Sequence, residues 1–221
     1  MPTSKPEKAV QPTLSPSLVL DAALVRTQKD GIDFSMRALA SDLDVWPMAI
    51  YRHYKNREAL IEAIVDTVLA KALTQDAINA LCDINQPWRS RFETFCLHMY
   101  DVYIEYPGVA QKVLYGSLYT PSGLRLVETV AGMFVDLGVD RLRAASIFQA
   151  VGFFVCEMAM LDYARRRGDS DLEGLLHRIG DVKDQYPIAH DYIQLMASVE
   201  LRDRLKTGLG LFSQAVESEL P

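Results

Sequence analysis

The sequence has little cysteine: Cys82, Cys96 and Cys156 are the only three among 221 residues, and no two of them form a C-x-x-C pair. This small, odd number argues against a disulfide framework or a structural zinc cage and indicates a reducing compartment. Residues 1–11 contain two lysines but no apolar run behind them, so no secretory signal is predicted. We therefore expect a cytoplasmic protein.

Glycine and proline are also sparse, with 12 and 10 residues, and the chain is 49% hydrophobic and 24% charged. Such a composition excludes a collagen-like or low-complexity chain, and the length allows one large domain or two modest ones. Residues 144–161 are long enough to cross a membrane, but they include Gln149 and Glu157 and run into Asp162. A buried helix fits them better, and no membrane partner is predicted.

An excess of positive charge is absent as well. The formal net charge is -6, which taken alone speaks against a nucleic acid as partner. The charge is unevenly distributed, however: residues 1–74 hold 9 basic and 9 acidic side chains, whereas the remainder holds 14 basic and 20 acidic ones. The acidity therefore lies entirely in the second part of the chain.

Apolar residues recur three and four positions apart, and no stretch alternates with period two, so the sequence predicts an all-α fold. Residues 1–14 are polar, contain three prolines and show no period, which predicts a disordered tail. Capping residues and prolines then predict four helices in the first part, over Pro16 to Gly31, Met36 to Leu43, Pro47 to Tyr54 and Asn56 to Leu73.

The second part is also expected to be helical. The predicted helices cover Trp88 to Tyr106, Val109 to Tyr115, Pro121 to Leu137, Arg141 to Arg167 and about Glu200 to Glu219. Pro187 interrupts the weaker pattern between residues 169 and 196. We expect the disordered tail at residues 1–14, a helix-turn-helix domain with its linking helix at 15–73, and a helical domain at 74–221.

The most informative stretch is residues 34–60, FSMRALASDLDVWPMAIYRHYKNREAL. It predicts two short helices joined by a tight turn at Asp44-Val45, a geometry that lets a helix enter a DNA major groove about 12 Å wide. Between Val45 and Arg57 the sequence has three basic residues and a histidine but no acid. Such a face suits phosphate contacts, although a solvated basic face on a core helix pair is the alternative.

Residues 15–69 resemble the DNA-binding domain of the tetracycline-repressor (TetR) family of bacterial transcription regulators. The resemblance rests on the runs at 37–40 (Arg-Ala-Leu-Ala), 43–45 (Leu-Asp-Val) and, above all, 50–57 (Ile-Tyr-Arg-His-Tyr-Lys-Asn-Arg). It implies a repressor that binds a palindromic operator in double-stranded DNA as a homodimer and is released by a small-molecule effector. The phosphate contacts that it implies fall on Tyr51, Lys55 and Arg57, assisted by Ser35 and His53, while Arg37 reaches a base or phosphate.

The chain departs from the family pattern at two places. Asp44 stands where the turn usually has glycine, and aspartate tolerates a left-handed conformation better than most residues. The front of the recognition helix carries Trp46, Pro47, Met48 and Ala49 instead of small polar residues. These side chains cannot form bidentate hydrogen bonds with bases, so we expect readout through thymine methyl groups and DNA shape.

The second part is similar to the helical effector-binding domain of the same family. Its helix at 141–167 is apolar nearly all round, so it needs a partner, and the resemblance implies a homodimer through the two long C-terminal helices, with Phe154 or Phe212 at the interface. Gln149 and Glu157 are either effector ligands or structural hydrogen bonders, and an aromatic stripe is either a cavity wall or plain core. The expected effector site is Phe92, Cys96, Met99, Tyr103, Tyr115, Gln149, Phe153 and Glu157.

No glycine-rich phosphate loop, catalytic triad or pair of buried carboxylates is visible, so we expect neither an enzyme nor a cofactor or metal site. Two other classes compete with the regulator: a helical small-molecule-binding protein or enzyme without operator-specific DNA binding, and a protein-interaction scaffold. The basic run from Tyr51 to Arg57 favours the DNA-binding regulator because a scaffold has no need of it.

Overall fold

The structure, a computed structural model, describes residues 14–116, 119–169, 172–180, 183–218 and 220. These residues form twelve helices and no strand, which confirms the predicted all-α fold. The expected disordered tail at residues 1–14 lies outside the described residues except for Leu14.

Four helices make up the N-terminal part: α1 (Pro16–Asp30), α2 (Met36–Asp42), α3 (Pro47–Tyr51) and α4 (Arg57–Ala72). The side-chain oxygens of Ser15, Ser35 and Asn56 each accept a hydrogen bond from a backbone amide in the first turn of α1, α2 and α4. These caps satisfy amides that a helix start leaves unpaired, and they fix where the three helices begin.

Eight helices follow: α5 (Gln75–Cys82), α6 (Trp88–Glu105), α7 (Val109–Leu114), α8 (Pro121–Asp136), α9 (Arg141–Arg167), α10 (Leu172–Gly180), α11 (Pro187–Ser198) and α12 (Leu201–Glu217). The sequence pattern did not predict α5, and it left α10 and α11 as one interrupted segment. Thr74 caps α5 through its hydroxyl, and Pro187 opens α11.

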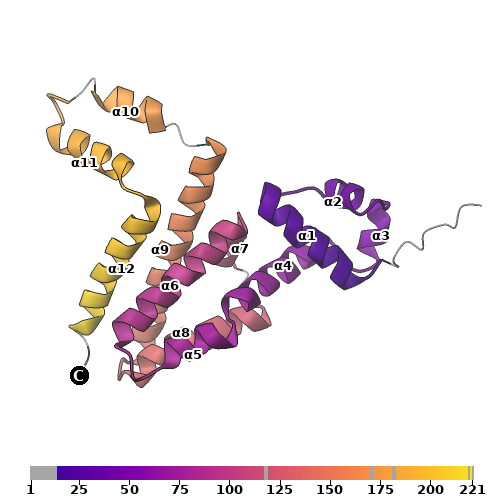
Figure 1. The fold of residues 1–221 in the computed structure, drawn as a ribbon, viewed down its shortest axis with the longest axis horizontal. Coiled ribbons are helices and arrows are strands. Elements are labelled where there is room, and N and C mark those ends of the chain that lie inside the picture. The colour runs from indigo at the N-terminus through magenta and orange to yellow at the C-terminus, as the bar shows by residue number, and fades with distance from the viewer. Residues whose placement is uncertain (1–13, 117–118, 170–171, 181–182, 219, 221) are drawn as a thin grey trace, which may run out of the picture.

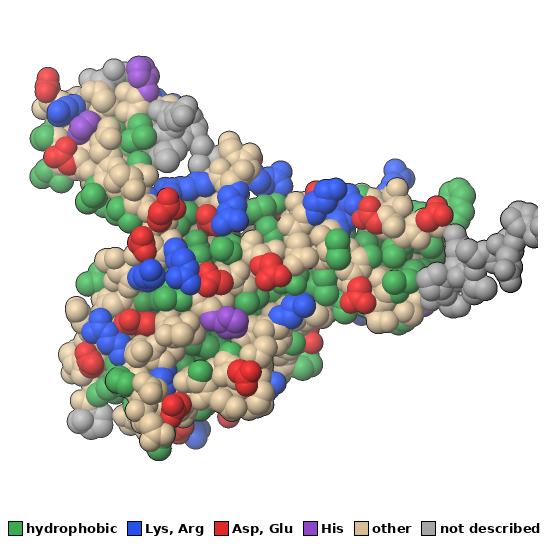
Figure 2. All heavy atoms as spheres, viewed as in Figure 1, with side chains coloured by type: hydrophobic (Ala, Val, Ile, Leu, Met, Phe, Trp, Pro, Cys, Tyr) green, Lys and Arg blue, Asp and Glu red, His purple; other side chains and the backbone are tan. Residues whose placement is uncertain are grey.

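Figure 1 shows α1, α2 and α3 gathered at one end of the molecule, with α4 leading from them into a larger group of helices, here called the larger domain. In that group α9 and α12 run side by side, and α6 packs on both. The hairpin of α10 and α11 stands off from this body as a separate lobe (Figures 1 and 2).

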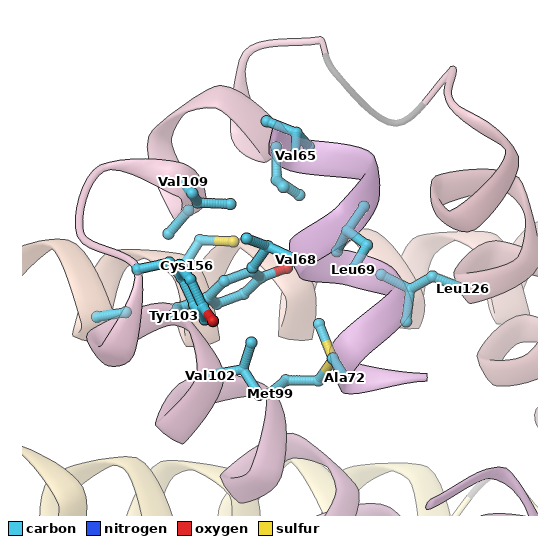
Figure 3. Packing of buried hydrophobic residues seen from close by; sticks show 14 of the residues in the cluster. Val65, Val68, Leu69, Ala72, Met99, Val102, Tyr103, Val109, Leu126 and Cys156 are labelled. Atoms are coloured by element: carbon cyan, nitrogen blue, oxygen red, sulfur yellow. The ribbon is translucent and has the colours of Figure 1, made fainter. Parts of the chain in front are cut away.

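The hydrophobic core is continuous through α4. Figure 3 shows Val65, Val68 and Leu69 of α4 facing residues of the larger domain, among them Tyr103 on α6 and Leu126 on α8. The three α4 side chains are completely buried. The second half of α4 therefore belongs to the core of the larger domain, and it joins the two parts of the chain firmly.

Helix α9 is buried on one face only within the chain. Its inner face, with Val151 and Val155, packs against the neighbouring helices, whereas Leu142 on the outer face is exposed. By length and composition α9 is also the one described helix that could cross a membrane, which is weak evidence because core helices of soluble proteins pass the same test.

Phe154 and Phe212, of which we expected one or the other at the interface between chains, contact each other within the chain. Their ring centroids lie 5.6 Å apart, between α9 and α12. Their first role is therefore to hold the two helices of one chain together. Exposed apolar side chains on the same two helices are Leu142, Phe153 and Leu211.

Candidate nucleic-acid interface and candidate binding cavity

The turn between α2 and α3 has the geometry of a helix-turn-helix. Asp44 has φ = 51°, which confirms the expected left-handed conformation, and it is the one described non-glycine residue with positive φ. The amide of Val45 donates to the carbonyl of Ala40 over 3.0 Å, which closes the turn. Ile50 is fully buried and anchors α3 to the core, so the rest of the short helix faces outward.

The front of α3 is apolar and exposed. Trp46 is 85% exposed and Met48 is 70% exposed, which is unusual for large hydrophobic side chains. Pro47, between them, and Ala49, which follows Met48, are half-buried. This surface offers methyl, thioether and indole groups to a partner, as the sequence predicted.

Three cations of the same segment lie on α2 and directly after α3. Arg37, Arg52 and Lys55 are exposed, and none has an ion-pair or hydrogen-bond partner in the described part of the chain. Tyr51 in the same segment is 40% exposed, and His53 is half-buried. Unpaired cations can bind phosphates without first breaking an internal salt bridge.

Two of the predicted contact residues already have structural roles. The Ser35 hydroxyl accepts from the amide of Ala38 at 3.1 Å and so caps α2. The guanidinium of Arg57 donates to the carbonyls of Ile32 and Phe34 and lies 3.4 Å from the carboxylate of Asp33. Arg57 therefore ties the start of α4 to the segment before α2, and its phosphate contact stays a prediction.

A cavity of about 390 Å³ opens inside the larger domain. Its walls come from α6, α7, α8 and α9 together with the segment between α7 and α8. Six of the eight residues expected at an effector site line it, namely Phe92, Cys96, Met99, Tyr103, Gln149 and Phe153. Tyr115 and Glu157 are exposed and do not line it.

Other parts of the cavity wall were not predicted from the sequence. Phe95, Tyr119, Leu126, Phe148 and Gly152 also line the cavity. Gly152 was a usable signal, since a glycine in the middle of a long apolar helix costs stability and leaves room for a neighbour. The residues from α8 gave no such signal because their apolar pattern is that of ordinary core.

The cavity wall is uncharged. None of the described residues that line it is acidic or basic, and its polar groups are the Gln149 amide, the hydroxyls of Tyr103 and Tyr119, and two thiols. Burial raises the pKa of the Tyr103 phenol well above its usual value and, as the largest effect, raises the pKa of the Cys156 thiol to about 12. These groups are therefore neutral at physiological pH, and the cavity suits an uncharged, largely apolar occupant.

Residues 19–64 match the family described as "Bacterial regulatory proteins, tetR family". The repressor DrrR1 of Streptomyces coeruleorubidus is 23% identical over 76% of this chain and 63% of its own length. The class A tetracycline repressor protein from transposon 1721 of Escherichia coli is 35% identical over 35% of this chain and 34% of its own length. The chain thus spans less than two thirds of the length of these curated relatives.

Solved structures share the fold. A possible TetR family regulator from Streptomyces coelicolor superposes with a TM-score of 0.80 at 18% identity, covering 92% of this chain and 99% of its own. The TetR family protein ActR of the same organism, in complex with (S)-DNPA, gives a TM-score of 0.74 at 18% identity over 95% of this chain and 100% of its own. Residues 19–64 thus match the tetR family of bacterial regulatory proteins, and the described part of the chain shares the fold of solved TetR family proteins.

Proposed function

We propose that the protein is a cytoplasmic transcriptional repressor that binds a palindromic operator in double-stranded DNA as a homodimer and is released by a small-molecule effector. The observation that carries the proposal is the exposed front of α3 with the unpaired cations Arg37, Arg52 and Lys55 around it. A protein that did not bind a polyanion would gain nothing from such a surface. The curated relative DrrR1 is itself named a transcriptional repressor.

The homodimer is supported by the outer faces of α9 and α12. Leu142 is 78% exposed and Leu211 is 64% exposed, so apolar area remains uncovered on two long helices that run side by side. A second copy of the same two helices would cover it through a two-fold interface. The symmetry then requires two recognition helices and an inverted-repeat operator, with half-sites about 34–36 Å apart.

The effector site is the cavity between α6 and α9. Its size, aromatic wall and lack of charged lining residues favour an uncharged aromatic molecule, with the Gln149 amide as the group that fixes its orientation. Proteins of similar fold have been solved with small molecules bound: ActR with actinorhodin, and a TetR variant from Acinetobacter baumannii with minocycline. A ligand that binds more tightly to a conformation with a different separation of the two recognition helices would weaken operator binding. The loss is set by the difference between its affinities for that conformation and for the DNA-binding one.

Selection from a library of random DNA duplexes tests the proposal. The wild-type protein is expected to enrich duplexes that share an inverted repeat, with both half-sites on one face of the helix. Recovery of sequences with a single half-site would contradict the homodimer. Failure to enrich any sequence would contradict operator binding itself.

A further inference from the structure

The last turns of α9 contact the end of α1 through one tyrosine. The hydroxyl of Tyr163 donates a hydrogen bond to the backbone carbonyl of Asp30 at 3.2 Å. The same hydroxyl accepts a hydrogen bond of 2.8 Å from Arg167, whose guanidinium also lies 5.4 Å from the centre of the tyrosine ring. Arg167 of the same helix therefore fixes the orientation of the tyrosine, and the tyrosine hydroxyl binds the end of α1.

The contact depends on a glycine. Gly31 ends α1 with φ = 82° and ψ = 169°, a conformation that residues with side chains rarely adopt. A Cβ atom at this position would lie 2.2 Å from the hydroxyl oxygen of Tyr163. Only a residue without a side chain lets the tyrosine approach the end of α1 so closely.

A second attachment lies beside the first. The amide of Ile32 donates to the carbonyl of Pro107, in the turn between α6 and α7, over 3.0 Å. A Cβ atom at Gly108 in that turn would lie 2.8 Å from the side chain of Ile32, so this approach is also tight. The segment that leaves α1 is thus fixed to the larger domain at two separate points.

Tyr163 lies on the helix that forms one wall of the cavity. Gln149, Gly152 and Cys156 of α9 line the cavity, whereas Tyr163 does not. It follows Cys156 by seven residues, which is two helical turns or about 10 Å on the same face of α9. The helix continues unbroken to Arg167, so a displacement of the cavity wall carries Tyr163 with it.

We propose that Tyr163 is the positioning residue that couples the cavity wall on α9 to the orientation of the helix-turn-helix through its bond to Asp30. This inference rests on the proposed function. It gives the cavity a second connection to the helix-turn-helix, through α9 and α1, besides the one that α4 makes through the core. Coupling between binding sites is reciprocal. DNA that fixes α1 must therefore also restrain the cavity segment of α9.

Hydrogen exchange of the full-length protein, with and without a duplex recovered by the selection above, tests the coupling without any effector. In the wild type the duplex is expected to slow exchange in residues 145–156 by about fivefold, at the low end of typical couplings. In Tyr163→Phe, which keeps the ring but loses the hydroxyl, the slowing should disappear. The matched control is Tyr186→Phe, because Tyr186 is exposed on the distant hairpin and should behave as wild type.

Residues 46–57 report DNA binding in the same experiment, and they should become protected in all three proteins. If residues 145–156 respond equally in wild type and Tyr163→Phe, Tyr163 does not carry the coupling. If they do not respond even in the wild type, the two sites are not coupled through α9. If no duplex protects residues 46–57, the proposed DNA binding fails, and this inference fails with it.

Discussion

The ring of Phe154 on α9 occupies the space beside Gly208 on α12. A Cβ atom at Gly208 would lie 2.3 Å from the nearest carbon of that ring. Phe212, one turn further along α12, contacts the same ring, and the two ring centroids lie 5.6 Å apart. The two long helices can therefore approach closely only because residue 208 has no side chain.

Replacing Gly208 by alanine should force the Phe154 ring to move and should lower the free energy of unfolding by about 1–3 kcal/mol, the usual cost of overpacking. Gly132→Ala is the matched control, because a Cβ atom there meets nothing within 4 Å. Within α8, four residues before its end, that change should instead stabilise the protein by about 0.5–1 kcal/mol. Urea denaturation measures both, and equal effects of the two substitutions would show that the contact is not tight.

Lys55→Ala should weaken binding to all duplexes to a similar degree, since an unpaired lysine beside α3 contacts phosphates and not bases. The slope of log affinity against log salt should fall in magnitude by about one. Fluorescence anisotropy at several salt concentrations measures this slope. Lys206→Ala is the control, since Lys206 pairs with Asp203 on α12; an unchanged slope in Lys55→Ala would remove Lys55 from the interface.

Leu142→Asp and Leu211→Asp should each convert the homodimer into a folded monomer, because they place a charge on the exposed apolar faces of α9 and α12. Phe154→Asp should differ, since Phe154 packs within the chain and its replacement should unfold the protein or make it insoluble. Light scattering and circular dichroism separate the two outcomes. A wild-type protein that is already monomeric at micromolar concentration would overturn the dimer.

Readout by α3 should depend on thymine methyl groups, because Trp46 and Met48 offer exposed apolar contacts and no bidentate hydrogen bonds. Replacing thymine by uracil at single operator positions deletes only the methyl group. At least one such position in each half-site should lose affinity in the wild type. If every uracil substitution is silent while Arg37→Ala abolishes discrimination, readout rests on Arg37 instead.

Local features of the fold could be predicted from the sequence because their causes lie within a few residues. Ser15 and Asn56 cap the helices that follow them, and Asp44 adopts the left-handed turn where glycine is usual. Helix α5 was not predicted, although its hydroxyl cap at Thr74 and its buried Leu81 are visible in hindsight. A helix of eight residues leaves too short a periodic pattern to stand out.

Long-range relationships could not be predicted, because nothing in the local sequence specifies them. Gly31 marks the end of α1 in the sequence, but its closeness to Tyr163 depends on how α9 packs across the domain junction. Arg57 resembles a phosphate ligand by its position, whereas the fold brings the carbonyls of residues 32 and 34 within its reach. Most of the predicted cavity residues do line the cavity, but Glu157 and Tyr115 fall on outer surfaces.

The central claim, sequence-specific DNA binding, is tested most directly by the ratio of two dissociation constants. These are the constants of the wild-type protein for the selected duplex and for a duplex of the same composition with its sequence shuffled. At physiological salt the account predicts that the selected duplex binds about a thousandfold more tightly or better. Equal dissociation constants for the two duplexes would contradict it, because the basic surface around α3 would then be a non-specific polyanion site.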